Sequence, residues 1–161
     1  MTVETLGEKV ADFCLLNQTG QAVSLAGFVG RWVIIYFYPK ASTPGCTVQA
    51  CGMRDTWSSF ESLNAVVLGV SPDPVARLNK FYTAQQLNFD LLSDPDHKLT
   101  ERFGVWALKK FMGKEFMGVV RTTFIIDPDG NLAAALRQFK TSDHHTHVID
   151  ELSQLIQARA T

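Results

Sequence analysis

The sequence has few of the features that mark secreted or membrane-spanning proteins. Three of its 161 residues are cysteines, too few for the disulfide framework of a small secreted domain. The longest strongly apolar run, Trp32 to Tyr38, is far too short to span a bilayer. The first residues lack the basic start and apolar stretch of a secretory signal. We therefore expect a soluble cytoplasmic protein.

The chain also lacks an excess of charge of either sign. Fifteen basic and sixteen acidic residues give a formal net charge of -1. Proteins that bind nucleic acid or anionic membranes usually carry a marked basic excess. We expect neither partner for this chain.

What is present is enough apolar material for one folded unit. Hydrophobic residues make up 46% of the chain and charged residues 19%, a composition typical of globular proteins. No repeat, low-complexity stretch or linker divides the sequence. We expect a single domain over residues 1–161.

The order of apolar segments and turns predicts an α/β fold. Strands alternating with helices favour a largely parallel central sheet, and the Asp127–Gly130 turn adds an antiparallel edge. The order fits a thioredoxin-like fold, with a mixed sheet flanked by helices and an added N-terminal β-hairpin. The expected strands are 11–16, 22–25, 32–38, 65–70, 89–92, 119–126 and 132–138; the expected helices are 46–63, 74–86, 96–103 and 144–158; and 109–118 is expected to be a loop.

One cysteine, Cys46, lies where a buried strand gives way to a helix. A helix start presents free N–H groups and a partial positive charge, and both favour the ionised sulfur, which is the nucleophile. The hydroxyl of Thr43 can reach the sulfur or an incoming oxygen. Pro44 and Gly45 form a tight turn that lets a substrate approach, and Pro39 can shield the sulfur. The alternative is an inert buried cysteine.

A second cysteine, Cys51, follows five residues after Cys46. On an ideal helix this spacing separates the Cα atoms by about 8.7 Å, whereas a disulfide requires about 7 Å or less. The two can therefore bond only if the helix unwinds locally. Gly52 lowers helix stability by roughly 1 kcal/mol relative to alanine, which eases the unwinding. The alternative is that Cys51 serves packing alone.

At these residues the chain resembles the peroxiredoxins, and among them the bacterioferritin comigratory protein group, also called the Q type. The central shared motif is Thr43-Pro-Gly-Cys46. The resemblance covers nearly the whole chain, through segments 36–39, 43–47, 49–51, 54–55, 91–94, 103–106, 111–113, 121–127 and 139–142.

The resemblance implies a thiol peroxidase that reduces hydrogen peroxide and organic hydroperoxides. Cys46 matches the peroxidatic cysteine, which becomes a sulfenic acid, and Cys51 the resolving cysteine of an intramolecular disulfide. Thioredoxin, or alternatively glutaredoxin, is the implied reductant; no cofactor or metal is implied, and the protein is expected to be a monomer. The other matched positions are the catalytic Thr43 and Arg121 and the pocket residues Pro39, Pro44 and Gly45.

Two other functions compete with this interpretation. Thiol–disulfide oxidoreductases carry two cysteines separated by two residues; here four residues intervene, and Thr43 stands in place of a second cysteine. A non-enzymatic holdase or binding protein is the other, although the balanced charge and the lack of an apolar repeat argue against it. Peroxide consumption separates these functions from a peroxidase.

The remaining candidates favour structural roles. Cys14 is expected to be a small core residue within a strand. The cluster His144, His145 and His147 is expected to face solvent beside a helix start rather than to bind a metal. The stretch 111–117 either lines a hydrophobic rim near the pocket or packs internally, and the sequence leaves both open.

Overall fold

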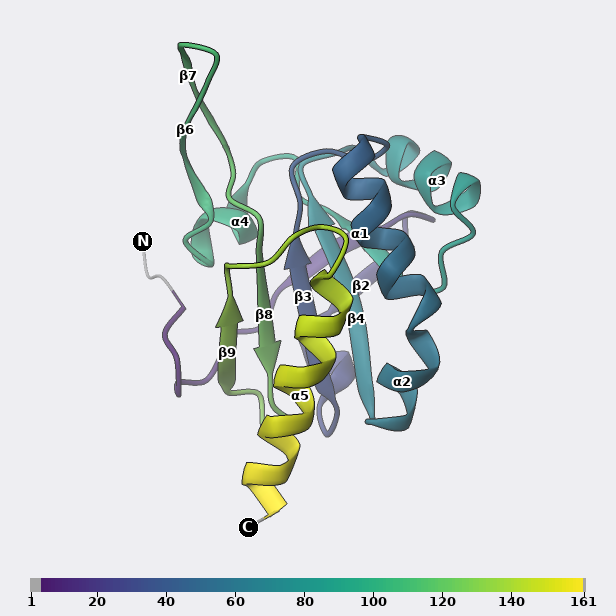
Figure 1. The fold of residues 1–161 in the computed structure, drawn as a ribbon, viewed down its shortest axis with the longest axis vertical. Helices are drawn as coiled ribbons and strands as arrows, with labels where there is room; N and C mark the ends of the chain where they lie inside the picture. Colours follow the sequence, from purple (N-terminus) through teal and green to yellow (C-terminus); the bar gives the residue numbers. More distant parts are fainter. Residues whose placement is uncertain (1–3, 161) are drawn as a thin grey trace.

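The computed structural model describes residues 4–160, and its centre is a seven-stranded mixed sheet (Figure 1). The strands are β1 Cys14–Asn17, β2 Ala22–Ser24, β3 Trp32–Phe37, β4 Ala65–Ser71, β5 Asp90–Ser93, β8 Thr122–Ile126 and β9 Leu132–Leu136. Their order is β2-β1-β5-β4-β3-β8-β9, with β3, β4 and β5 parallel and the others antiparallel to their neighbours. The expected thioredoxin-like α/β fold, with its added N-terminal hairpin of β1 and β2, is confirmed.

Six helical segments connect and cover these strands. They are η1 Leu25–Phe28, α1 Pro44–Asp55, α2 Trp57–Ser62, α3 Val75–Ala84, α4 Lys98–Arg102 and α5 His144–Ala160. The single helix expected over 46–63 is divided at Thr56, whose hydroxyl donates to the carbonyl of Gly52 at 2.8 Å and favours a bend. Within residues 4–160, no helix is both long and apolar enough to cross a bilayer.

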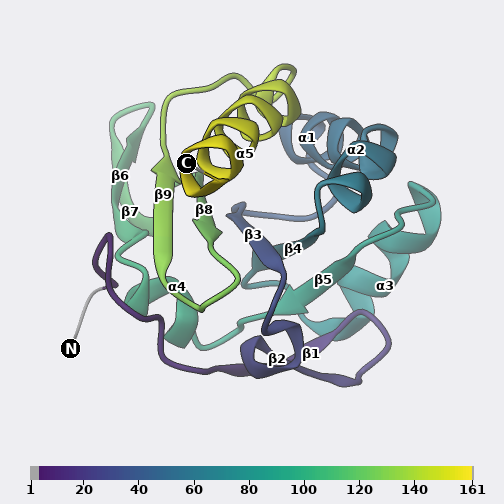
Figure 2. The ribbon, with the colours of Figure 1, turned by 90° about the horizontal axis from the view of Figure 1, so that it is seen from below.

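Two hydrophobic cores lie on opposite faces of the sheet. Strand β3 is buried along its whole length, and its alternate residues point to opposite faces. Ile34 and Tyr36 belong to the core beneath α1, α2, α3 and α5, whereas Ile35 and Phe37 belong to the core covered by α4 and the N-terminal segment. Figure 2 shows α1, α2 and α5 together on one face and α4 on the other.

The segment expected to be a loop over 109–118 is instead a β-hairpin. Strands β6 Trp106–Phe111 and β7 Lys114–Val119 pair antiparallel in a separate two-stranded sheet. The connecting residues Met112 and Gly113 both have positive φ, 52° and 78°, which is the backbone of a type I′ hairpin turn. The prediction failed because it treated the glycine as a sign of irregular structure.

Cys14 is exposed rather than buried, so its expected place in the core is wrong. It shares one face of β1 with Leu16, which is also exposed, because residues two apart in a strand point the same way. That face carries no covering helix in the described part of the chain.

Candidate active site

The start of α1 holds Cys46 near the carboxyl end of β3. Thr43 is the last extended residue, with φ -80° and ψ 155°, and Pro44 is the first helical one. Cys46 is then the third residue of the helix, within the turn whose N–H groups have no helical acceptor. The helix start expected from the sequence is confirmed, two residues earlier than expected.

A buried carboxylate fixes the loop before α1. Oδ2 of Asp73 accepts hydrogen bonds from the N–H of Ala41 at 2.7 Å and from the hydroxyl of Ser71 at 2.8 Å. Asp73 is followed by Pro74, which occupies the N-cap position of α3. Since β3 and β4 run parallel, the loops after them meet at one edge of the sheet, and Asp73 ties them together. The tie holds Ser42 at a left-handed φ of 67°, a conformation that is uncommon for a non-glycine residue.

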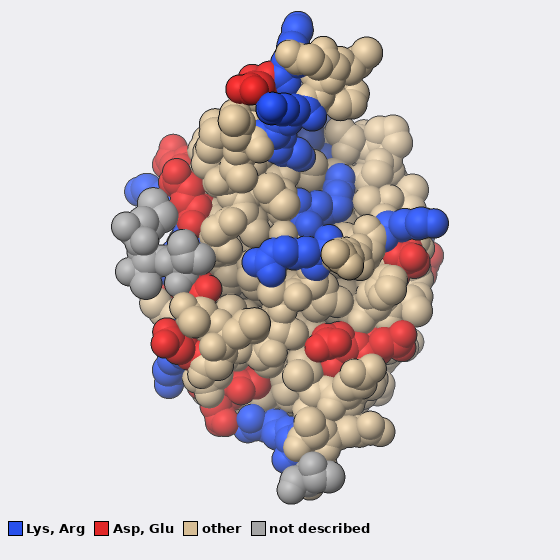
Figure 3. All heavy atoms as spheres, turned by 60° about the vertical axis from the view of Figure 1, so that its left-hand side comes forward, with Lys and Arg blue, Asp and Glu red and all other residues tan. Residues whose placement is uncertain are grey.

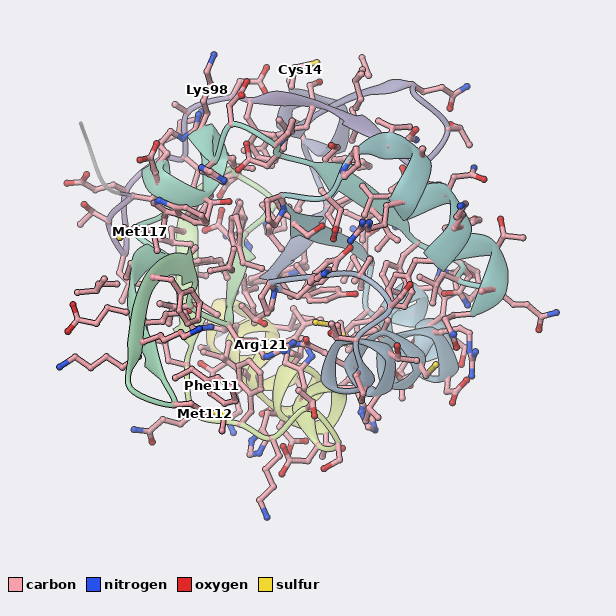
Figure 4. The ribbon with its side chains drawn as sticks, turned by 90° about the horizontal axis from the view of Figure 1, so that it is seen from above. Cys14, Lys98, Phe111, Met112, Met117 and Arg121 are labelled. Atoms are coloured by element: carbon pink, nitrogen blue, oxygen red, sulfur yellow. The ribbon has the colours of Figure 1, made fainter. Side chains whose placement is uncertain are left out.

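Arg121 lies beside the sulfur of Cys46, as the resemblance implies. Its Nη1 donates to Sγ at 3.4 Å and to Oε1 of Gln49 at 2.6 Å. The Cys46 side chain is 1% exposed and Gln49 is fully buried. A Cβ atom at Gly45 would lie 3.6 Å from Nη2 of Arg121, so this glycine borders the guanidinium. Figure 4 shows Arg121 beside the start of α1.

Thr43 makes a different contact from the one expected. Its hydroxyl donates to the carbonyl of Lys40 at 2.9 Å rather than to the sulfur. With the proton so directed, the oxygen retains lone pairs with which to accept a hydrogen bond. Of the two prolines assigned to the pocket, Pro39 is half-buried and Pro44 is exposed at the first turn of α1.

Two buried tyrosines lie beneath the site. The rings of Tyr36 and Tyr38 are 5.4 Å apart, and both side chains are 1% exposed. Burial raises the pKa of Tyr36 well above its usual range, and it raises the pKa of Tyr38 as well. Both phenols therefore stay neutral near pH 7, and the positive charge at the sulfur comes from Arg121 and the helix start.

His144 is fully buried, which contradicts its expected exposure. Its Nε2 and the hydroxyl of Thr123 on β8 are 2.6 Å apart, and its ring lies against Tyr36 and Phe139. Burial, reinforced by the charges of His145 and Arg121, lowers the pKa of His144 to about 3. The first turn of α5 is thus built into the core behind the site.

The buried imidazole predicts a loss of stability in acid. The unfolded chain binds a proton at His144 near pH 6.5, whereas the folded chain binds it only near pH 3. Stability is therefore retained above pH 6.5 and lost as the pH falls toward 3, by about 2 kcal/mol between pH 8 and pH 5. Urea unfolding at the two pH values measures this loss. His144→Gln should reduce the difference by that amount, and an unchanged difference would contradict the assignment.

The second cysteine, Cys51, lies on the same helix and is half-buried. Its Sγ lies 3.5 Å from Oε1 of Gln85 at the end of α3, and the carbonyl of Gln85 accepts a bond from Nη1 of Arg54 at 2.7 Å. Both Cys46 and Cys51 are free thiols within the unbroken helix Pro44–Asp55. The helical spacing of about 8.7 Å therefore applies, and a bond between them requires α1 to unwind.

Gly52 has a packing role that the sequence did not reveal. A Cβ atom there would lie 3.1 Å from both Cγ and Cε1 of His145 on α5. Glycine is therefore needed for the close approach of the two helices, in addition to its low helix propensity. Unwinding α1 breaks this contact as well.

Four residues at or behind the site were not placed there by the sequence-based prediction: Gln49, Asp73 and Tyr36, which it did not assign, and His144, which it placed in solvent. Gln49 had a usable signal, since it follows Cys46 by three residues and so lies on the same helix face. The other three reach the site through contacts distant in sequence. Among residues 4–160, no three histidine, cysteine or acidic side chains are grouped as a metal ion would require.

The chain is similar in sequence to known proteins. Residues 6–135 match the AhpC/TSA family. The chain is 47% identical over 148 residues to the peroxiredoxin Bcp of Escherichia coli K12, which covers 92% of this chain and 95% of that protein. It is 44% identical over 155 residues to the peroxiredoxin Bcp of Bacillus subtilis 168, with coverages of 96% and 98%.

Solved structures of similar proteins share the fold. The bacterioferritin comigratory protein of Xanthomonas campestris, described for its alkyl peroxide reduction activity, superposes with a TM-score of 0.83 at 34% identity, covering 88% of this chain and 90% of that one. A cysteine-to-serine variant of PrxQ from Xylella fastidiosa superposes with a TM-score of 0.89 at 29% identity over the full length of both chains.

Proposed function

Because the chain belongs to the AhpC/TSA family and is a peroxiredoxin, a thiol peroxidase, we propose that Cys46 is its peroxidatic residue and Cys51 its resolving residue. The observation that carries this assignment is the contact of 3.4 Å between Nη1 of Arg121 and the sulfur of Cys46 at a helix start. We further propose that the substrates are hydrogen peroxide and organic hydroperoxides.

In the first step the Cys46 thiolate attacks one oxygen of the peroxide. The S–O bond forms as the O–O bond breaks, so the sulfur is oxidised to a sulfenic acid. The leaving oxygen departs as hydroxide from hydrogen peroxide, or as an alkoxide from an organic hydroperoxide, and takes up a proton. Arg121, held by Gln49 at 2.6 Å, stabilises the charge as it moves from sulfur to oxygen. Thr43 accepts a hydrogen bond from the peroxide, since its own proton is directed to Lys40.

In the second step Cys51 reduces the sulfenic acid. Its sulfur attacks Cys46, the S–O bond breaks, and water leaves as the disulfide forms. This step requires α1 to unwind and Cys51 to leave Gln85, because both cysteines lie in one helix. An external dithiol, which we propose to be thioredoxin, then exchanges with the disulfide and restores both thiols.

The remaining assignments concern the pocket and the protein's surroundings. Pro39, Pro44 and Gly45 form the wall around the sulfur. Gly45 leaves the guanidinium of Arg121 accessible. The protein acts as a monomer in the cytoplasm, whose reducing conditions suit free cysteines that take part in chemistry.

Replacing the resolving thiol tests the division of roles between the cysteines. Cys51→Ser should consume about one equivalent of peroxide and then stop, because the Cys46 sulfenic acid has no internal partner. Mass spectrometry of the peroxide-treated variant should find one added oxygen on the peptide that contains Cys46. Sustained turnover with thioredoxin as the only reductant, or oxidation at Cys14 instead, would contradict the proposed roles.

A further inference from the structure

The hairpin of β6 and β7 exposes large apolar side chains at its tip. Phe111 is 68% exposed and Met112 is 87% exposed, and Leu108, Phe116 and Met117 are exposed along the strands behind them. Within residues 4–160, β6 and β7 pair only with each other. The internal packing that the sequence left open for this stretch is therefore not found, and Figures 1 and 3 show the hairpin projecting from one end of the molecule.

The hairpin carries a small local excess of positive charge, although Nζ of Lys110 lies 3.5 Å from a carboxylate oxygen of Glu115. Residues 106–119 contain three lysines and one glutamate, a local net charge of +2, although the whole chain carries -1. Lys110 lies opposite Glu115, and Lys114 opposite Phe111, in the register of the hairpin. Figure 3 shows basic groups at this end of the molecule, one of them at its extreme tip, with an acidic group beside them. The balanced total charge conceals this local excess.

Apolar residues lie on both faces of the hairpin. Leu108 and Met117 are paired and project to one face, whereas Phe111 and Phe116 project to the other. A second copy of the chain or another folded protein covers one face of such a hairpin and leaves the other in water. A lipid surface surrounds both faces at once, which suits an apolar tip with cations set behind it.

We propose that this hairpin docks on an anionic lipid bilayer, with Phe111 and Met112 inserted among the acyl chains. The long side chains of Lys110 and Lys114 can then extend their ammonium groups back to the headgroups, where each cation near an anionic surface adds to the attraction. The net charge of the whole chain predicts no anionic membrane partner. The local charge of the hairpin leads us to the opposite expectation for this part of the surface. A tip of two apolar residues gives reversible docking rather than a permanent anchor.

The docking would orient the active site toward the bilayer. Strand β8 runs antiparallel to β3, so Val119 to Thr122, which join β7 to β8, lie at the same edge of the sheet as Cys46. Figure 4, viewed from above this edge, shows the hairpin residues Phe111 and Met112 on the same side of the molecule as Arg121. Docking does not depend on peroxidase activity, because it involves only the exposed side chains of the hairpin.

Sedimentation with sucrose-loaded vesicles tests the proposal. At low salt, the wild-type chain should partition onto vesicles of phosphatidylcholine and phosphatidylglycerol, and only weakly onto phosphatidylcholine alone. Phe111→Ser with Met112→Ser should lower the partition coefficient at least about tenfold, and Lys110→Gln and Lys114→Gln about fivefold each. Val29→Ser is the matched control, since Val29 is also exposed but precedes β3, at the opposite end of the sheet.

Three results would overturn the proposal. One is that the wild-type chain stays in solution with anionic vesicles, and another is that Val29→Ser weakens binding as much as the tip variant. The third is that ultracentrifugation without lipid finds a dimer that the tip variant abolishes, which would assign the hairpin to a second copy. Cys46→Ser should bind vesicles like the wild type, so failure of the peroxidase assignment and failure of the docking assignment are distinguishable.

Discussion

Cys46→Ser should lower steady-state peroxide turnover by more than about 10³-fold, as expected when the nucleophile of a catalytic group is removed. A serine hydroxyl is a much weaker nucleophile than a cysteine sulfur, so it cannot attack the peroxide in place of the thiol. Neither of the other cysteines can substitute. Cys51 lies five residues along the helix beside Gln85, and Cys14 is on the distant strand β1. Peroxide consumption with thioredoxin as reductant measures the effect.

Cys14→Ser is the matched control for this variant. Because Cys14 is exposed on β1, its replacement should leave turnover and the free energy of unfolding nearly unchanged. Comparable activity in Cys46→Ser and wild type, or a large loss in Cys14→Ser, would move the reactive sulfur elsewhere.

Arg121→Met should slow the oxidation of Cys46 by about 10²- to 10³-fold, the range for loss of one fixed donor to a developing charge. The variant removes both the positive charge at 3.4 Å from the sulfur and the bond to Gln49. Arg121→Lys keeps the charge but not the planar fork, so it should recover only part of the rate. Stopped-flow measurement of the second-order rate constant with hydrogen peroxide separates oxidation from the later steps.

Arg159→Met controls for the loss of a cation. Arg159 pairs with Asp127 and Asp129 near the C-terminal end of α5, far from α1 (Figure 1). Its replacement should leave the rate constant of Cys46 oxidation unchanged. If Cys46 were oxidised at the wild-type rate in the Arg121→Met variant too, the guanidinium of Arg121 would have a structural role only.

The local part of the fold could be predicted from the sequence. Strand β3 was evident from its run of β-branched and aromatic residues, and the helix start at Cys46 from Pro44 and the preceding strand. These signals work because they depend on neighbours in the chain. The β6–β7 hairpin was missed because Gly113 suggested irregular structure and because the other turn residue, Met112, takes a positive φ, which methionine rarely adopts.

The supporting contacts of the site could not be predicted in this way. Asp73 holds the N–H of Ala41 from 32 residues away, and His144 meets Thr123 across 21 residues. A single sequence does not indicate such long-range contacts, because a lone aspartate or histidine is usually found at the surface. The sequence therefore singled out the two candidate cysteines, but not the groups that hold the loop and helix around them.

The deep burial of Cys46 also determines what a reductase can recognise. With both thiols free, Cys46 is 1% exposed within an intact helix, so its sulfur is not accessible to a protein as large as a reductase. In the proposed cycle, the unwinding of α1 that joins the two cysteines would also expose the disulfide. A reductase would then bind the oxidised protein in preference to the reduced one, because only the oxidised protein presents its sulfurs.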